Sequence, residues 1–187
     1  QILPLVDTLK DELKNTKFYY LSAHENHFNS TLKDLNCEIE SLNLKIKYFG
    51  FRWWHFLITK KRFEKLNIEE IDLIIDLQSK LRNTIILKQI PHKLFYSSTY
   101  SFKFCTNKKE YSSKDHLINL DKFLNTNIKV SSFSLKKLPE NYKNEAKRLL
   151  PGKNYIGFSL TQGNVYRKKS WSTKNFIELA SKITDKN

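Results

Sequence analysis

The feature that most constrains the fold is residues 71–77, which read Ile-Asp-Leu-Ile-Ile-Asp-Leu. Nearly continuous apolar runs of this length are typical of strands buried on both faces of a parallel sheet. A helix is predicted at 81–90, where Pro91 ends it because proline cannot continue a helix, and a further strand at 93–96. A strand, a helix and another strand in succession predict a parallel α/β sheet with right-handed crossovers.

The same alternation extends along most of the chain. Besides the elements above, apolar spacing predicts helices at 2–13 and 24–35 and strands at 18–21 and 37–42. Apolar stripes that end near Asn127 and at Leu150 predict two more helices. A strand from 154 to 160, a polar loop from 161 and a helix with Phe176, Leu179, Ala180 and Ile183 on its buried face follow. We make no secondary-structure prediction for the aromatic and basic segment 44–66.

Pro151 and Gly152 mark a predicted domain boundary, because the helix before them ends decisively and a new strand follows. This gives a domain at 1–150 and the beginning of another at 151–187. The chain begins with Gln1 on a helix and ends with Asn187 after a helix, where an α/β repeat would next need a strand. We therefore expect a fragment that lacks the first strand of its first domain.

The composition favours anionic partners. The formal net charge is +14 at pH 7, which suits sugar nucleotides, phosphorylated glycolipids, a membrane surface or nucleic acid, although lysines spread over solvated faces would give the same charge. Cys37 and Cys105 are far apart, and the five histidines lack metal-ligand spacing, so we expect no metal and a reduced, cytoplasmic setting. No apolar stretch is long enough for a membrane span.

The loop at 161–171 is the strongest candidate for a phosphate site. It lies between a predicted strand and a predicted helix and carries Arg167, Lys168 and Lys169. Turn amides and a helix N-terminus offer unpaired N–H donors to an anion, and basic side chains can close over it. The loop is neither a Walker A motif nor a dinucleotide fingerprint, because it has a single glycine and no Gly-Lys-Ser/Thr triplet. A solvated basic loop is the alternative.

Three segments share motifs with one enzyme family. The first contains Thr161-Gln162-Gly163, then Lys169-Ser170-Trp171, and then Phe176 and Leu179-Ala180; the second, 71–82, reads IDLIIDLQSKLR; the third is the His116 helix that continues to Leu124. Together they resemble family 9 glycosyltransferases, the lipopolysaccharide heptosyltransferases. Ser172 and Lys174 depart from this pattern, since they stand where the family usually has Pro and Glu. Ser172 can still cap the helix through its hydroxyl.

The resemblance implies a GT-B-type fold, with a Rossmann-like acceptor-side domain at 1–150 and the opening of the sugar-nucleotide domain at 151–187. The implied reaction moves a heptose-like sugar from an ADP-heptose-like donor to the anionic glycolipid of the lipopolysaccharide inner core, without cofactor or tightly held metal. The general-base Asp of the family is expected before Gln1, so no catalytic residue is assigned here and the fragment alone is expected to be inactive. The implied location is the cytoplasm, with peripheral contact with the inner membrane.

Two groups of residues are candidates for this function. Thr161, Gln162, Gly163 and Lys169 would bind the donor phosphates. Asp76, Gln78 and Arg82 follow the 71–77 strand, where open α/β sheets place ligands, and would bind the anionic acceptor, Arg82 through paired hydrogen bonds. Alternatively, Asp76 and Gln78 cap the next helix and Arg82 is a surface cation.

The aromatic and basic segment around Trp53 and Trp54 has two readings. Such side chains suit a membrane interface, yet aromatic residues are more often simply core. A different function for the whole chain is a basic α/β module that binds nucleic acid through its lysines and exposed aromatics. A sugar-nucleotide site concentrates cations at one cleft, whereas nucleic-acid binding needs a continuous track of them.

Overall fold

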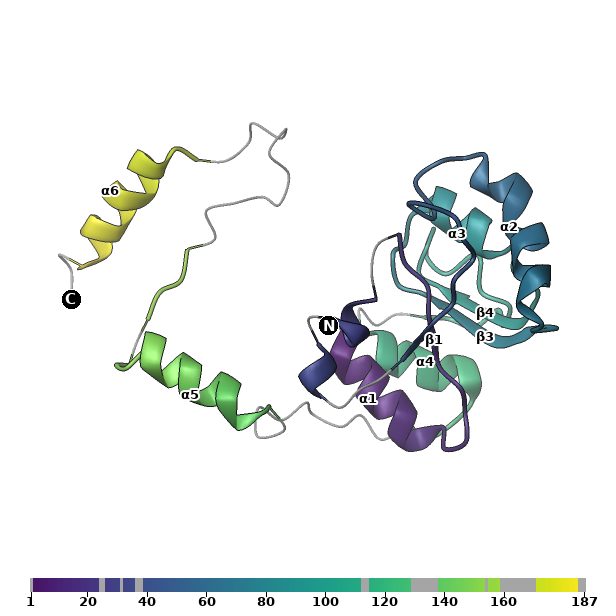
Figure 1. Cartoon of the computed structure of the whole chain (residues 1–187), viewed down its shortest axis with the longest axis horizontal. Helices are drawn as coiled ribbons and strands as arrows, with labels where there is room; N and C mark the ends of the chain where they lie inside the picture. Colours follow the sequence, from purple (N-terminus) through teal and green to yellow (C-terminus); the bar gives the residue numbers. More distant parts are fainter. Residues whose placement is uncertain are drawn as a thin grey trace. The chain divides into compact units, whose positions relative to one another are not determined.

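The structure, a computed structural model, describes residues 2–23, 26–30, 32–35, 39–111, 115–128, 138–153, 155–158 and 171–184 (Figure 1). By its internal contacts the chain forms two compact units, Gln1–Pro139 and Glu140–Asn187. The helix that we had placed at the end of a first domain therefore belongs to the second unit. The assignment of acceptor-side and donor domains stays a prediction.

The first unit alternates helices and short strands. Its elements are α1 (Ile2–Glu12), β1 (Tyr19–Tyr20), η1 (His27–Asn29), η2 (Lys33–Leu35), β2 (Glu40–Ser41), α2 (His55–Phe63), η3 (Glu64–Leu66), β3 (Ile71–Asp76), α3 (Leu81–Leu87), β4 (His92–Ser97) and α4 (His116–Leu124). The second unit contains α5 (Glu140–Leu149) and α6 (Thr173–Thr184). This mixture of helices with parallel strand pairs is compatible with the predicted α/β class.

The strands form two parallel pairs among the described residues. β1 pairs with β2, placing Tyr19 beside Glu40. β3 pairs with β4 from Ile71 beside His92 to Asp76 beside Ser97, and α3 is the connection between them. The predicted strand–helix–strand unit is thus confirmed. Its register places the polar ends of β3 and β4 side by side.

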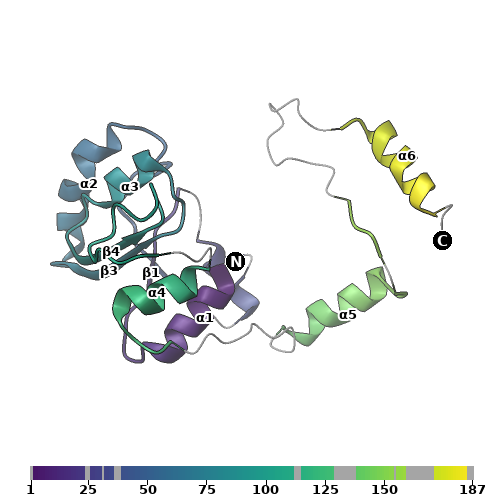
Figure 2. The same cartoon turned by 180° about the vertical axis from the view of Figure 1, so that it is seen from behind.

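Helices cover both faces of the β3–β4 pair. Leu73 and Ile75 of β3 pack against the buried cluster of α1 and α4, whereas Ile74 packs against the cluster that includes Phe63 of α2 and Ile86 of α3. Figures 1 and 2 show the same layers from opposite sides, with α2 and α3 on one face of the pair and α4 on the other. The alternating side chains of β3 explain this, because successive residues of a strand point to opposite faces.

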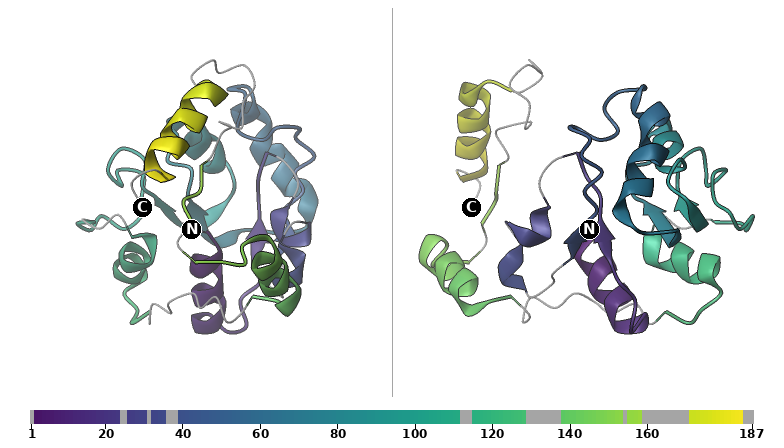
Figure 3. Two further views of the ribbon diagram at one scale, coloured as in Figure 1. Left: turned by 90° about the vertical axis from the view of Figure 1, so that its left-hand side faces the viewer. Right: turned by 45° about the vertical axis from the view of Figure 1, so that its right-hand side comes forward.

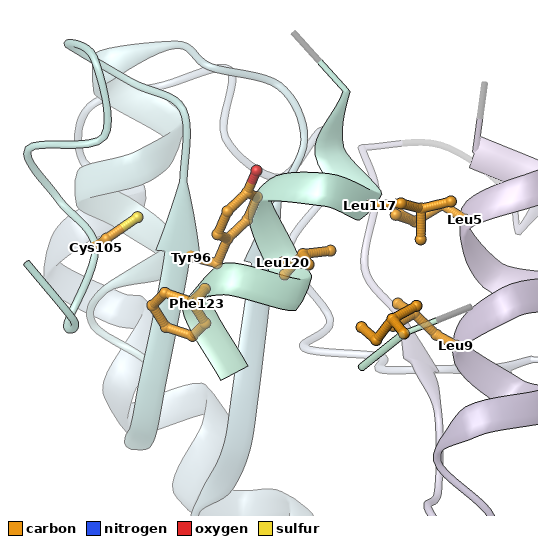
Figure 4. Packing of buried hydrophobic residues seen from close by; sticks show 8 residues of the cluster. Leu5, Leu9, Tyr96, Cys105, Leu117, Leu120 and Phe123 are labelled. Atoms are coloured by element: carbon orange, nitrogen blue, oxygen red, sulfur yellow. The ribbon is translucent and has the colours of Figure 1, made fainter. Parts of the chain in front are cut away.

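The α1–α4 layer holds the largest buried cluster. Leu5 and Leu9 of α1 meet Leu117 and Leu120 of α4, whose apolar residues recur at helical spacing (Figure 4). The right-hand view of Figure 3 shows the two helices next to each other. On the sheet side of the cluster, Tyr96, Cys105 and Phe123 pack together, and burial raises the pKa of the Cys105 thiol. Each fully buried leucine or phenylalanine contributes about 1.5–3 kcal/mol relative to an exposed one.

Three predictions of local structure were wrong. Instead of a helix at 24–35, the described residues form two 3-10 turns, because Asn26 accepts a hydrogen bond from the Phe28 amide (3.0 Å) and its Nδ2 donates to the Ile39 carbonyl (2.7 Å). Of the strand predicted at 154–160, only 155–158 are described, and they form no strand with any other described segment. In β3, burial on both faces is incomplete, since Asp72 is exposed and forms an ion pair with Lys93 (2.6 Å).

Candidate functional site

Asp76, the last residue of β3, is the centre of a buried polar cluster. Its side chain is 1% exposed. Oδ1 accepts a hydrogen bond from the Gln78 amide (3.0 Å), and Oδ2 accepts from the hydroxyls of Ser97 (2.9 Å) and Thr84 (2.5 Å). Hydrogen bonds to a charged acceptor are stronger than neutral ones, so this carboxylate fixes the ends of both strands relative to α3.

The hydroxyl groups extend this cluster along the end of β4. Thr84 Oγ1 lies 2.7 Å from Thr99 Oγ1, and the Thr99 amide donates to Ser97 Oγ (3.2 Å). Because the single Thr84 hydroxyl proton goes to Asp76, the Thr99 hydroxyl donates to Thr84. All three hydroxyl residues are buried, so this polar cluster lies within the protein.

Gln78 and Ser79 form the exposed part of the same edge. The Gln78 side-chain carbonyl accepts a hydrogen bond from Asn83 of α3, and the Ser79 hydroxyl is bonded to that of Ser98 after β4. These polar groups sit at the carboxyl ends of two parallel strands, the position where open α/β sheets bind ligands.

Arg82 connects this edge to the loop that precedes α2. Its Nε donates to the Gly50 carbonyl (2.7 Å), and the Gly50 amide donates to Nδ1 of His55 at the start of α2 (3.1 Å). Arg82 is partly buried, and in the described ranges no ion pair involves it. Its guanidinium is thus not paired with a carboxylate of the described residues.

The surroundings of His55 disfavour its protonated form. Burial lowers its pKa, and the positive charges of Arg82 and Arg52 lower it further. Since Nδ1 accepts the Gly50 amide, the ring proton lies on Nε2. Two buried atoms beside this arrangement, His55 Nε2 and Asn83 Oδ1, have no hydrogen-bond partner among the residues that the structure describes.

Several residues in the loops around this edge have left-handed backbone. Gly50 (φ +83°) and Ser79 (φ +54°) adopt it, and after β4 three consecutive residues do so, Tyr100, Ser101 and Phe102. For a non-glycine residue this conformation is less favourable by roughly 1–2 kcal/mol. The loop after β4 is closed at its base, where the Thr106 amide donates to the Phe95 carbonyl and the Thr106 hydroxyl accepts from the Phe95 amide, both at 2.9 Å.

The structure brings one predicted group together. Asp76, Gln78 and Arg82 lie at one edge of the β3–β4 pair, as expected from their sequence positions. They do not cap α3 directly, since its N-cap residue Lys80 makes no side-chain cap. The partners in the loop before α2 and after β4 were missed, because no local pattern indicates which distant segments meet.

The predicted donor-phosphate residues Thr161, Gln162, Gly163 and Lys169 lie outside the described residues. Beyond them, Trp171 is exposed, and the Ser172 hydroxyl accepts a long hydrogen bond from the Asn175 amide (3.4 Å) at the start of α6. That bond confirms the predicted hydroxyl cap.

An open hollow of about 480 Å³ lies away from the Asp76 edge. It is lined by Lys10, Thr16, Lys17, Phe18, Asn29, Ile39 and Glu40. The Lys17 ammonium forms an ion pair with Glu40 (2.7 Å), which raises the pKa of Lys17. Of the predicted site residues that the structure describes, Asp76, Gln78 and Arg82 do not line this hollow.

Within the described ranges, no three His, Cys, Asp or Glu side chains are grouped as a metal site requires, and no helix has the length and apolarity to cross a membrane. In comparisons with known proteins, the chain matches no family model, no curated protein and no solved structure.

Proposed function

We propose that the chain is part of a GT-B glycosyltransferase that transfers a heptose-like sugar from a nucleotide-diphosphate donor to an anionic glycolipid of the lipopolysaccharide core. The observation that carries the proposal is the arrangement of Asp76, Gln78 and Arg82 at the carboxyl end of a parallel strand pair. The sequence motifs at 71–82, 116–124 and 159–180 that resemble family 9 enzymes support it.

The three acceptor-side residues have different roles in this proposal. Asp76 is a positioning residue, because its oxygens are already occupied by protein donors. Gln78 and the guanidinium of Arg82 contact the acceptor, whose phosphates or carboxylates suit paired N–H donors. Lys169 and the 161–163 turn contact the donor diphosphate. Stabilising the charge that develops on that leaving group supplies most of the catalysis, with a base accepting the acceptor proton.

Isothermal titration of the 187-residue protein tests the acceptor side of this proposal. The titrant is deacylated lipopolysaccharide inner-core oligosaccharide, which carries the anionic groups without the lipid. Loss of a charged hydrogen bond should weaken binding of the Arg82→Gln variant by about 1.5–3 kcal/mol. Lys93→Gln is the matched control, because it removes one cation from the opposite end of β4. Absence of oligosaccharide binding, or an equal loss in both variants, would refute the acceptor assignment.

A second titration with ADP-heptose tests the donor side. Binding that is weakened by Lys169→Ala and unaffected by Arg82→Gln would support separate donor and acceptor groups. If the protein binds neither titrant but binds single-stranded DNA with an affinity that falls steeply with salt, the enzyme proposal is wrong and the nucleic-acid alternative holds.

A further inference from the structure

The segment from Tyr48 to Lys61 forms an unusual exposed surface on the first unit. It exposes aromatic and aliphatic side chains next to cations, and we call it the aromatic–basic surface: Tyr48, Phe51, Arg52, Trp53, Trp54, Phe56, Leu57, Lys60 and Lys61. Trp53 is 58% exposed and Leu57 is 76% exposed. Large exposed apolar side chains gathered in one short segment are typical of an interaction site in a folded protein.

The charge of this region has a single sign. Between residues 41 and 63 the chain has six lysines and arginines and no aspartate or glutamate. A partner for this surface therefore has to be anionic, and it also has to accept apolar side chains.

The apolar side chains are exposed because the segment is anchored from beneath. His55, Thr59 and Phe63 form the buried face of α2 at helical spacing, and the Thr59 hydroxyl donates to the His55 carbonyl (2.7 Å). The opposite face carries Phe56 and Leu57 in the first turn and the two lysines in the second.

The loop before α2 is fixed as well. Phe49 is buried beside Phe63, and Gly50 is bonded to both Arg82 and His55. Trp54 packs edge-on against the His55 ring, with ring centroids 4.3 Å apart, and still remains 54% exposed. The rings therefore project from a supported loop, so their exposure does not result from poor packing.

We propose that the aromatic–basic surface docks the protein onto an anionic lipid bilayer. Trp53, Trp54 and Leu57 enter the headgroup–acyl boundary, where amphipathic rings and aliphatic side chains are favoured. Arg52, Lys60 and Lys61 contact the lipid phosphates. A bilayer fits better than nucleic acid because Leu57, the most exposed of the apolar residues on this surface, has no ring on which a base could stack.

This proposal is independent of the proposed glycosyl transfer, and vesicle sedimentation of the 187-residue protein tests it. Vesicles of phosphatidylcholine alone are compared with vesicles containing 30% phosphatidylglycerol. We expect partitioning into the anionic vesicles to be at least tenfold stronger, and to weaken as salt screens the cations. Equal partitioning into both vesicles, or none, would overturn the proposal.

Paired variants locate the contact. Trp53→Ser should lower partitioning at least about fivefold, whereas Trp171→Ser removes an equally exposed tryptophan from the other unit and should leave it unchanged. Lys60→Gln combined with Lys61→Gln should lower it at least about tenfold, since each cation near an anionic surface is worth about a factor of five. Lys93→Gln combined with Lys122→Gln removes the same amount of charge elsewhere on the first unit and should lower vesicle partitioning less than twofold.

Two results would assign the surface differently. In the first, the Trp171 control lowers vesicle partitioning as much as Trp53→Ser, or the Lys93/Lys122 control as much as the Lys60/Lys61 variant. Either result would show nonspecific adsorption and contradict the docking surface. Tighter binding of a single-stranded oligonucleotide than of anionic vesicles, abolished by Trp53→Ser, would identify a base-stacking surface and overturn the lipid proposal. Circular dichroism of each variant verifies folding, and these exposed positions leave the buried clusters intact.

Discussion

Nε of Arg82 lies 2.7 Å from the Gly50 carbonyl oxygen, and this hydrogen bond joins the first turn of α3 to a loop 32 positions earlier in the chain. Gly50 can occupy this place because it has no side chain. Its φ of +83° suits glycine, and an added Cβ would lie 3.0 Å from Asn83 Oδ1. The contact of α3 with the loop therefore depends on one glycine.

Gly50→Ala should destabilise the first unit by about 1–2 kcal/mol, because alanine disfavours left-handed backbone and its Cβ crowds Asn83. Urea unfolding followed by circular dichroism measures this change. Gly157→Ala is the matched control, since an added Cβ there meets nothing within 4 Å. Equal stability of the two variants would contradict the role of Gly50.

Asp76→Asn should lower the free energy of unfolding by about 2–3 kcal/mol, because hydrogen bonds to a buried charged acceptor are lost and one amide N–H faces another donor. Asp72→Asn, on the same strand, removes only an exposed ion pair with Lys93 and should cost less than about 1 kcal/mol. Chemical denaturation of both variants gives the comparison. If the Asp72 variant lost as much stability, the buried cluster would not be the element that joins β3, β4 and α3.

His55 gives the unfolding free energy a specific pH dependence. Because its folded pKa lies below the ordinary value of 6.5, the unfolded chain binds the proton first as the pH falls. The free energy of unfolding should therefore decrease as the pH falls from about 6.5 to the folded pKa of His55. Above about pH 6.5 His55 should cause no such decrease.

His55→Asn tests the pH dependence, since asparagine keeps an acceptor near the Gly50 amide but does not titrate. Denaturation at pH 8 and at pH 5 should show a smaller decrease for the variant than for the native protein. An identical decrease would mean that His55 is not a source of the acid sensitivity.

Cys105 should resist alkylation in the native protein. Its side chain is 2% exposed, and burial raises its pKa, so little reactive thiolate is available. Mass spectrometry after iodoacetamide treatment at pH 8 should show labelling of the Cys105 peptide only as urea unfolds the first unit. Rapid labelling without denaturant would be inconsistent with the α1–α4 cluster.

The helices of the two units should differ in amide exchange. α4 buries Leu117, Leu120 and Phe123, whereas α5 buries none of its residues. Amides in α5 should therefore exchange faster than those in α4, because local opening of α5 exposes little apolar surface. Deuterium uptake by mass spectrometry compares the two peptides, and slower exchange in α5 would contradict its exposed packing.

Where the pattern was strong, the sequence predicted the elements well. The apolar run of β3, the proline after α3 and the spaced leucines of α1 and α4 all reflect local physics, so the elements were recognised with errors of a few residues. The 24–35 segment was misread because its periodicity rests on few apolar residues, and the Asn26 side chain competes for backbone hydrogen bonds there.

The site was predictable to a smaller extent. That Asp76, Gln78 and Arg82 share an edge follows from the end of one strand and the helix after it. Hydrogen bonds to Asp76 from β4, such as that of Ser97, depend on the register of β3 against β4. The bond of Arg82 to Gly50 depends on a loop with no regular pattern. Long-range pairing of this kind is not encoded in any local window.

The bonds between Phe95 and Thr106 have a consequence for how such a protein diversifies. They close the loop after β4 at its base, while Phe95 stays paired with Ile74 of the neighbouring strand. Insertions at the exposed tip of the loop, Tyr100 and Ser101, would therefore leave the sheet register unchanged, because Tyr96 and Ser97 belong to β4 and Cys105 to the buried core. Length and sequence at Tyr100 and Ser101 can thus change at little cost to folding, whereas Phe102 is held by its packing against Tyr96 and Tyr111.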